Sequence, residues 1–356
     1  EIASCLVGSE MCIRDRQIAA LQGRTRAWTV LSALFALALL SFVVAGVMGS
    51  VTLSLGDIAD AMRELLQGAA SSMAATLVEL RLSRALSAFV TGASLTLAGV
   101  MMQALLRNPL AEPYVLGVSG GAAVGALAAM LVCTLAWVVD VAAFGGAMAV
   151  SLILFLLARR DLRGAAGSDG SAPLLLLTGV ILASGCGALV TLMLSIAPDN
   201  RLRGMVFWLI GDLSGTQFRW IPWMVLAGAL LFAVRVARAI NVIALHAEAA
   251  STLGINVARF RGGLFVCSAL LTASAVSNAG SIGFVGLIVP HACRFVLGPD
   301  HRLLLPAATL VGGTFLVLAD TLARTIVAPQ QLPVGVITAI IGVPVFLLQL
   351  HQLRKR

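Results

Sequence analysis

Residues 81–121 read RLSRALSAFVTGASLTLAGVMMQALLRNPLAEPYVLGVSGG. No charged residue occurs between Ala85 and Leu106. At a rise of about 1.5 Å per residue, a helix of this length crosses a hydrocarbon layer of roughly 30 Å. The Asn108-Pro109 pair that follows favours a helix end and a turn, after which a second apolar, glycine-rich run begins. The segment therefore predicts two membrane spans joined by a short ordered turn.

The composition of the whole chain agrees with a membrane protein. Of its 356 residues, 60% are hydrophobic and 11% are charged, against roughly 25% charged in soluble domains. The long unbroken apolar runs favour helices, since the strands of a membrane barrel alternate with period two. We expect an all-α integral membrane protein with about ten transmembrane helices. The formal charge of +8 does not indicate a nucleic-acid partner, because the arginines stand singly or in pairs between apolar runs.

Ten apolar runs are long enough to be spans or nearly so. They cover residues 27–48, 85–106, 115–134, 138–158, 174–196, 220–239, 263–279, a short glycine-broken run ending near Leu297, 304–322 and 334–350. Two polar segments, 50–79 and 198–217, contain apolar residues at helical spacing or in a patch, which predicts a surface helix in each. We expect residues 1–16 to be non-native or disordered, and residues 17–356 to form a single transmembrane domain of ten helices.

An even number of spans places both termini on one side of the membrane. Most arginines and lysines fall on that side in this topology, so the positive-inside rule places both termini in the cytoplasm. One constant shift superposes Pro109 on Pro290 and Gly117 on Gly298. The two halves would then be inverted repeats, as in many transporters.

Several long motifs occur in a fixed order along the chain. In the first half they are R-L-S-R at 81–84, G-A-S-L-T-L-A-G at 92–99, Q-x-x-x-R-N-P-L-A-E-P at 103–113 and L-G-V-S-G-G at 116–121; in the second half they are G-F-V-G-L-I-V-P-H-x-x-R at 283–294, G-P-D-H-R at 298–302, A-D-x-x-A-R at 319–324 and L-P-V-G at 332–335. From about Val30 to the last residue, the chain resembles the FecCD-type permeases. These are membrane subunits of binding-protein-dependent ABC importers for iron-siderophores, haem and vitamin B12. One difference is Ser83, where the family usually has proline.

The resemblance implies ten helices per subunit, a homodimer, two cytoplasmic ATPase subunits and one periplasmic binding protein, in a bacterial inner membrane. The chain would then be a transport subunit without catalytic residues, cofactor or metal, because ATP and Mg²⁺ would be bound by the ATPase. The resemblance does not show whether the cargo is a siderophore, haem or cobalamin. The alternative is an ion-driven secondary transporter, which would need acidic residues in mid-membrane, whereas the acidic residues here fall near predicted span ends.

Residues 241–261 are too polar to cross lipid and are similar to the family's ATPase-coupling segment. The coupling residues that the resemblance implies are Ala247, Glu248, Ala250, Leu253, Gly254 and Ile255. A helix with a small apolar face, ended by a left-handed glycine at Gly254, suits this role. A plain cytoplasmic loop is the alternative.

Three arginines, Arg81, Arg84 and Arg324, fall at periplasmic span ends. The resemblance implies that they pair with acidic residues of the binding protein. Interfacial snorkelling is the alternative. For Arg324 there is also a candidate internal partner, because Asp320 lies four residues earlier on the same helix face and can neutralise its charge.

A further set of residues has a structural role in this interpretation: Gly92, Gly99, Asn108, Pro109, Gly117 and Pro290. We expect the glycines to allow close helix packing. His291 invites comparison with a haem ligand or a proton relay, but a hydrogen-bonded structural role is the simpler interpretation. The cysteines lack metal-ligand spacing, so no metal site is predicted.

Overall fold

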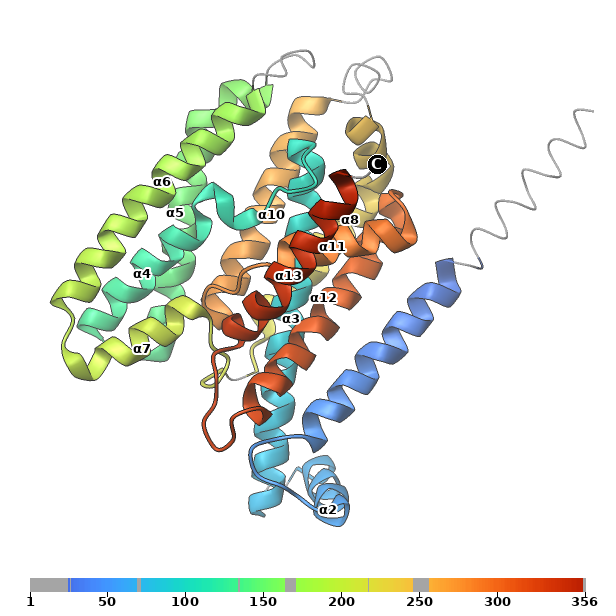
Figure 1. The fold of residues 1–356 in the computed structure, drawn as a ribbon, viewed down its shortest axis with the longest axis vertical. Coiled ribbons are helices and arrows are strands. Elements are labelled where there is room, and N and C mark those ends of the chain that lie inside the picture. Colours follow the sequence, from blue (N-terminus) through green and yellow to red (C-terminus); the bar gives the residue numbers. More distant parts are fainter. Residues whose placement is uncertain are drawn as a thin grey trace, which may run out of the picture.

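The structure, a computed structural model, describes residues 25, 27–68, 72–133, 135–163, 171–216, 218–245 and 256–354 (Figure 1). Within these ranges the regular elements are all helices. They are the Ala27–Val47 helix, α2 (Leu55–Leu66), α3 (Met73–Leu106), the 3₁₀ helix η1 (Pro113–Leu116), α4 (Val118–Val132), α5 (Ala136–Arg163), α6 (Ser171–Ile196), α7 (Asp199–Ile210), α8 (Trp220–Leu245), α10 (Val257–Ala279), α11 (Val285–Leu297), α12 (His301–Thr325) and α13 (Val334–Arg354). The prediction for residues 1–16 lies outside the described residues.

Seven of the described helices are long and apolar enough to span a membrane, and α4, α11 and α13 are shorter apolar helices. These ten helices correspond one for one to the ten predicted spans. The two remaining α-helices, α2 and α7, lie in the two polar segments where surface helices were predicted. Helix α2 begins with a reciprocal capping box between Ser54 and Asp57, which satisfies its first free N–H groups.

The largest error in the predicted boundaries concerns the second span. The sequence suggested a start at Ala85, after two arginines that would flank the membrane. Helix α3 instead begins at Met73, where the Ser72 hydroxyl accepts a hydrogen bond from the Ala75 N–H. The arginines lie inside this helix because other helices supply their partners. Helix α4, which corresponds to the third predicted span, also starts later than the predicted residue 115, because Gly117 takes a left-handed conformation (φ 76°) between η1 and α4.

Helix α3 is the centre of the core, and most of its residues are buried. It packs against α8, α10, α11 and α12. Two glycines of α3 allow the closest of these approaches. A Cβ atom at Gly92 would lie 2.3 Å from the Gly312 carbonyl oxygen of α12, and one at Gly99 would lie 1.9 Å from the Gly286 carbonyl oxygen of α11. Only glycine leaves room for backbones this close.

The two halves of the chain pack in a reciprocal pattern. Helix α3 contacts α12, and α10, its counterpart in the second half, contacts α5. Helices α3 and α10 are antiparallel: Ser268 of α10 bonds to Ala98 of α3, whereas Asn278, later in α10, bonds to Thr91, earlier in α3. The helix order thus has inverted-repeat character. The proposed residue match was wrong, because Gly117 begins α4 whereas Gly298 ends α11.

The bundle has two distinct ends in Figure 1. One end, called the α2 end below, carries α2, the start of α3 and the last turns of α12. The opposite end, called the C-terminal end, carries the end of α3, the start of α10 and the last turns of α13.

Candidate functional site

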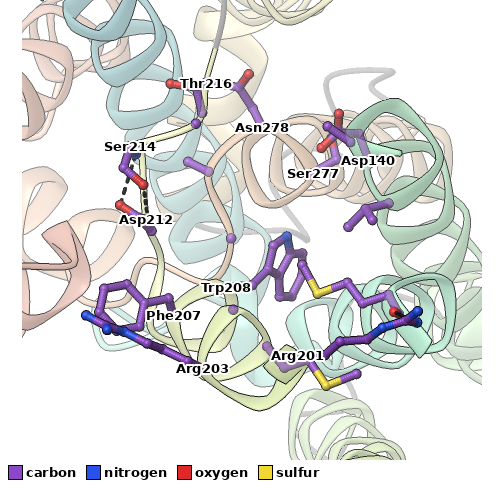
Figure 2. A pocket seen from close by; sticks show the side chains of 18 of the residues that line it. Asp140, Arg201, Arg203, Phe207, Trp208, Asp212, Ser214, Thr216, Ser277 and Asn278 are labelled. Atoms are coloured by element: carbon purple, nitrogen blue, oxygen red, sulfur yellow. Dashed lines mark hydrogen bonds between the residues drawn. The ribbon is translucent and has the colours of Figure 1, made fainter. Parts of the chain in front are cut away.

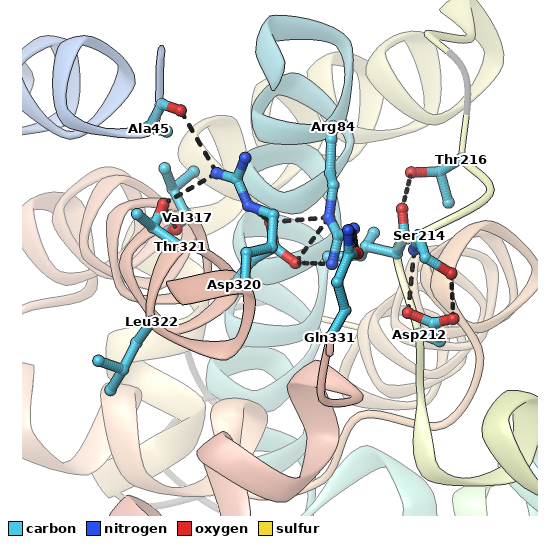
Figure 3. A network of polar contacts seen from close by, with 12 residues as sticks. Ala45, Arg84, Asp212, Ser214, Thr216, Val317, Asp320, Thr321, Leu322 and Gln331 are labelled. Atoms are coloured by element: carbon cyan, nitrogen blue, oxygen red, sulfur yellow. Dashed lines mark hydrogen bonds and ion pairs between the residues drawn. The ribbon is translucent and has the colours of Figure 1, made fainter. Parts of the chain in front are cut away.

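A buried group of charged side chains joins α3 to α12 at the α2 end (Figure 3). The arginine cluster, as it is called below, consists of the buried Arg81, Arg84, Asp320 and Arg324 and of Gln331, an exposed residue that bonds to Arg84. Arg84 Nε donates to both carboxylate oxygens of Asp320 at 3.0 Å, and its Nη2 donates to Oδ1 at 2.8 Å. Arg84 Nη1 donates to the side-chain oxygen of Gln331 at 2.7 Å. The Arg84 and Asp320 side chains are only 8% and 1% exposed.

Asp320 also forms an ion pair with Arg324, whose Nε lies 3.2 Å from Oδ2. This is the pairing along one helix face that the sequence allowed. One carboxylate therefore stands between two guanidinium groups that are almost completely buried. Burying such charges is tolerable only when each is paired and hydrogen-bonded.

The arginine cluster also holds the end of the Ala27–Val47 helix. Arg81 Nη1 donates to the carbonyl oxygens of Gly46 and Val47 at 3.0 Å, and Arg324 Nη2 lies 3.4 Å from that of Ala45. The last carbonyls of a helix lack partners within the helix, and a cation there is favourable.

The three arginines predicted to dock a binding protein thus have internal partners in the structure. None of them snorkels to an exposed position, because Arg81, Arg84 and Arg324 are all less than 9% exposed. Docking through them remains a prediction, and it would require an acidic partner to compete with Asp320 or with helix carbonyls.

A pocket of about 650 Å³ lies beside the arginine cluster, between α7, the start of α5 and the end of α10. We call it the α7 pocket. Figure 2 shows Trp208 in its middle, with Arg201 on one side and Arg203 with Phe207 on the other. The Arg203 guanidinium carbon lies 5.4 Å from the centre of the Phe207 ring, within cation–π range.

Other charged groups of the α7 pocket hold the scaffold together. Arg201 donates to the Met130 and Leu131 carbonyl oxygens at 2.8 and 2.6 Å, which caps the end of α4. Arg219 forms an ion pair with Asp140 of α5. Since these groups are already paired, the pocket offers a bulky molecule space and aromatic surface more than free charge.

The predicted coupling residues (Ala247, Glu248, Ala250, Leu253, Gly254 and Ile255) lie outside the described residues. Both flanks of their segment are described. At the end of α8, Asn241 Nδ2 donates to Asp300 Oδ1 at 2.7 Å, and Asn241 Oδ1 accepts the His301 N–H at 2.9 Å. At the start of α10, Asn256 caps the helix by accepting the Arg259 N–H at 3.1 Å. Side-chain hydrogen bonds therefore hold the chain on both sides of residues 246–255, which include the predicted coupling residues.

The N-P-L-A-E-P motif forms a turn that holds α11. The side-chain oxygen of Asn108, just before Pro109, accepts a hydrogen bond from the N–H of Leu110, just after it, at 2.9 Å. Glu112 then accepts the Phe284 N–H at 3.1 Å, at the start of α11. Burial raises the pKa of the Glu112 carboxyl above its ordinary value, and this hydrogen bond opposes the shift.

Pro290 and His291 lie inside α11. Because proline lacks an N–H, the Gly286 carbonyl four residues earlier has no helical donor, and this carbonyl is the group that faces Gly99. The buried Nδ1 of His291 has no hydrogen-bond partner in the described part of the chain. The hydrogen-bonded role expected for His291 is therefore not present at this nitrogen.

Sequence reasoning missed Gln331, Asn241 and Arg201. Gln331 and Arg84 are 247 residues apart, and Arg201 is 71 residues from Met130. No local pattern signals such pairs. The G-P-D-H-R motif was the available signal for Asn241, since Asp300 and His301 are its partners.

Comparisons with known proteins agree on one group. The model of the FecCD transport family matches residues 36–352. The cobalamin import system permease protein BtuC of Halobacterium salinarum is 43% identical over 284 residues, which cover 78% of this chain and 73% of that protein. The hemin transport system permease protein HmuU of Yersinia pestis is 40% identical over 292 residues, covering 78% and 84%.

A solved structure described as a metal-chelate type ABC transporter, in an inward-facing conformation, has a similar fold. Its TM-score is 0.79 at 28% sequence identity, and the match covers 91% of this chain and 99% of the solved one.

Proposed function

The chain belongs to the FecCD transport family and is the permease subunit of an ABC importer, and from this premise we propose that it moves a metal chelate or tetrapyrrole, such as a ferric siderophore, haem or cobalamin, into the cytoplasm. The observation that carries the cargo class is the 40–43% identity to permeases named for cobalamin and hemin. The α7 pocket supports it, since its volume lies within the range of small-molecule sites and its lining includes Trp208 and Phe207.

The alternative, an ion-driven transporter, has little support. Such a transporter needs an available acidic group within the membrane. Asp320 is the buried carboxylate in the described long spans, and two arginines already neutralise it.

For the orientation, we propose that the C-terminal end faces the cytoplasm. Arginines at that end include Arg235, Arg238 and Arg259, all of them exposed, and in the predicted topology most arginines and lysines of the sequence fall on that side. This distribution supports the positive-inside argument. A cysteine placed at exposed Val51 should react with a membrane-impermeant maleimide in intact cells, and labelling only after lysis would refute the orientation.

In the assembly that we propose, two copies of the chain pair and two ATPase subunits bind the coupling segment 241–261. A periplasmic binding protein docks at the α2 end. Docking through Arg81, Arg84 and Arg324 would exchange internal partners for acidic residues of that protein. Arg81→Glu should weaken binding-protein affinity, and an acid-to-lysine change on the partner should restore it; unchanged affinity would exclude Arg81 from the interface.

The transport proposal is tested in proteoliposomes containing the permease, its ATPase and its binding protein. Cobalamin, haemin and a ferric siderophore are offered separately, each with and without ATP. We expect ATP-dependent accumulation of one of these, with stimulation of ATP hydrolysis by the loaded binding protein. Failure of all three cargoes to accumulate, in a complex that hydrolyses ATP, would refute the proposed cargo class.

A further inference from the structure

An apolar groove of about 370 Å³ runs along the outside of the bundle between α8 and α10. Its lining includes Met224, Gly228 and Phe232 of α8 and Gly263, Val266 and Leu270 of α10. Met224 is 71% exposed and Val266 44% exposed, so the groove faces the surroundings of the bundle. Both helices are long spans, and hydrocarbon chains are therefore the surrounding medium.

The groove exists because small residues leave space on facing sides of two helices. A Cβ atom at Gly228 would have no neighbour within 4 Å, while one at Gly263 would lie 3.2 Å from the Phe232 ring. From Met224 to Phe232 the groove is about 12 Å long at a rise of 1.5 Å per residue. It is a shallow, wholly apolar channel parallel to the helix axes, with the shape of an acyl chain.

Two arginines continue the lining faces toward the C-terminal end. On α8, positions 228 and 232 lie on the groove, and Arg235 is the next residue of that face. On α10, positions 263, 266 and 270 lie on the groove, and Arg259 precedes them by one turn. Both arginines are exposed, and neither α8 nor α10 contains an aspartate or a glutamate. The apolar groove thus ends at two positive charges that no carboxylate of its own helices neutralises.

We propose that this groove binds an anionic phospholipid. One acyl chain lies along Gly228 and Gly263, and the phosphate lies between Arg235 and Arg259, whose long side chains reach the interface. The charge of the groove end distinguishes this occupant from a neutral lipid, because a basic side chain near a membrane surface favours anionic lipid about fivefold. The groove shares no lining residue with the α7 pocket or the arginine cluster, so it is a separate site.

The test uses the full-length chain in lipid nanodiscs. Phosphatidylglycerol with a photoreactive acyl chain is compared with phosphatidylcholine that carries the same chain. Mass spectrometry then maps lipid adducts on peptides from α8 and α10. We expect phosphatidylglycerol to label the groove residues more strongly than phosphatidylcholine. Each change, Arg235→Ala or Arg259→Ala, should lower the preference about fivefold, and Arg235→Lys with Arg259→Lys should retain it.

Matched variants separate groove binding from general effects on the fold. Gly228→Leu fills the groove where no protein atom stands in the way, so it should abolish groove labelling by both lipids. Gly145→Leu adds the same side chain at a second open glycine, on α5, and should change nothing. Arg238→Ala removes an exposed charge from a different face of α8 and should also leave the preference unchanged.

Three results would overturn the proposal. Equal labelling by the two lipids would show an ordinary annular lipid without headgroup recognition. An unchanged preference in the Arg235→Ala, Arg259→Ala double variant would exclude the arginines. Covalent links between two copies of the chain through groove residues, obtained with a photoreactive group at position 266, would show that a second copy covers the groove.

Discussion

Replacing Asp320 by asparagine should destabilise the protein strongly. The substitution keeps the size of the side chain but removes the charge that neutralises Arg84 and Arg324. All three side chains are less than 9% exposed, so water does not replace the lost carboxylate. Removing one partner of a buried ion pair costs about 3–5 kcal/mol, because the remaining charge stays buried. At about 2 °C per kcal/mol, as expected for a chain of this size, the apparent Tm should fall by roughly 6–10 °C.

The assay is thermal unfolding of the detergent-solubilised chain, followed by the fraction that remains monodisperse after heating. Asp60→Asn is the control, since it breaks an ion pair with Arg63 in which both side chains are more than 70% exposed. Such surface pairs contribute about 0–1 kcal/mol, so the control should melt with the parent protein. Adding Arg84→Gln and Arg324→Gln to Asp320→Asn should recover much of the loss. If Asp320→Asn melts with the parent, or if its effect is the same with both arginines removed, the arginine cluster does not behave as one charged unit.

Three further predictions concern other parts of the chain. Gly99→Val should prevent folding, because its side chain would collide with the Gly286 carbonyl oxygen, whereas Gly187→Val on α6 meets open space and should express as a monodisperse protein; equal yields would contradict the packing argument. Leu253→Asp should leave the chain inserted and ATP hydrolysis active in the complete importer while cargo uptake falls; normal uptake would remove the coupling role of 241–261. Asn241→Ala, which breaks the bonds to Asp300 and His301, should lower stability by about 1–2 kcal/mol and reduce uptake per ATP, measured with both rates in the same vesicles; an unchanged ratio would show that this anchor serves stability alone.

The ten spans were predictable because the hydrophobic effect acts on each segment separately. A run of apolar residues is unstable in water whatever its neighbours are, so length and composition locate it. Prediction of the ends failed where tertiary contacts replace water. Helix α3 extends twelve residues beyond its predicted start because Asp320 and the carbonyls of Gly46 and Val47 take over the solvation of Arg84 and Arg81.

The same distinction between local and long-range contacts decides which parts of the candidate sites could be predicted. The pairing of Asp320 with Arg324 was readable, since one helical turn separates them. The stronger bond of Asp320 to Arg84 joins residues 236 positions apart, and nothing in either segment alone indicates the other. Gly99 was recognised as a packing position, but its neighbour Gly286 lies in the other half of the chain. Contacts between the halves depend on how the helices cross, which residue spacing does not encode.

Helix α12 links the two ends of the molecule. Its first residues, after Asp300, are bonded to Asn241, the first residue of the proposed coupling segment 241–261, and its last turns carry Asp320 and Arg324 in the arginine cluster. Between them, Gly312 lies directly on Gly92 of α3, so the helix is held along its length. Its 25 residues span about 37 Å. A partner that competed for the arginines at the α2 end would therefore act on the same rigid element that Asn241 ties to the coupling segment. This continuity gives the proposed docking and coupling roles a physical connection, and the Asp320→Asn, Asn241→Ala double variant measures it: independent ends give additive losses of uptake, and a shared element does not.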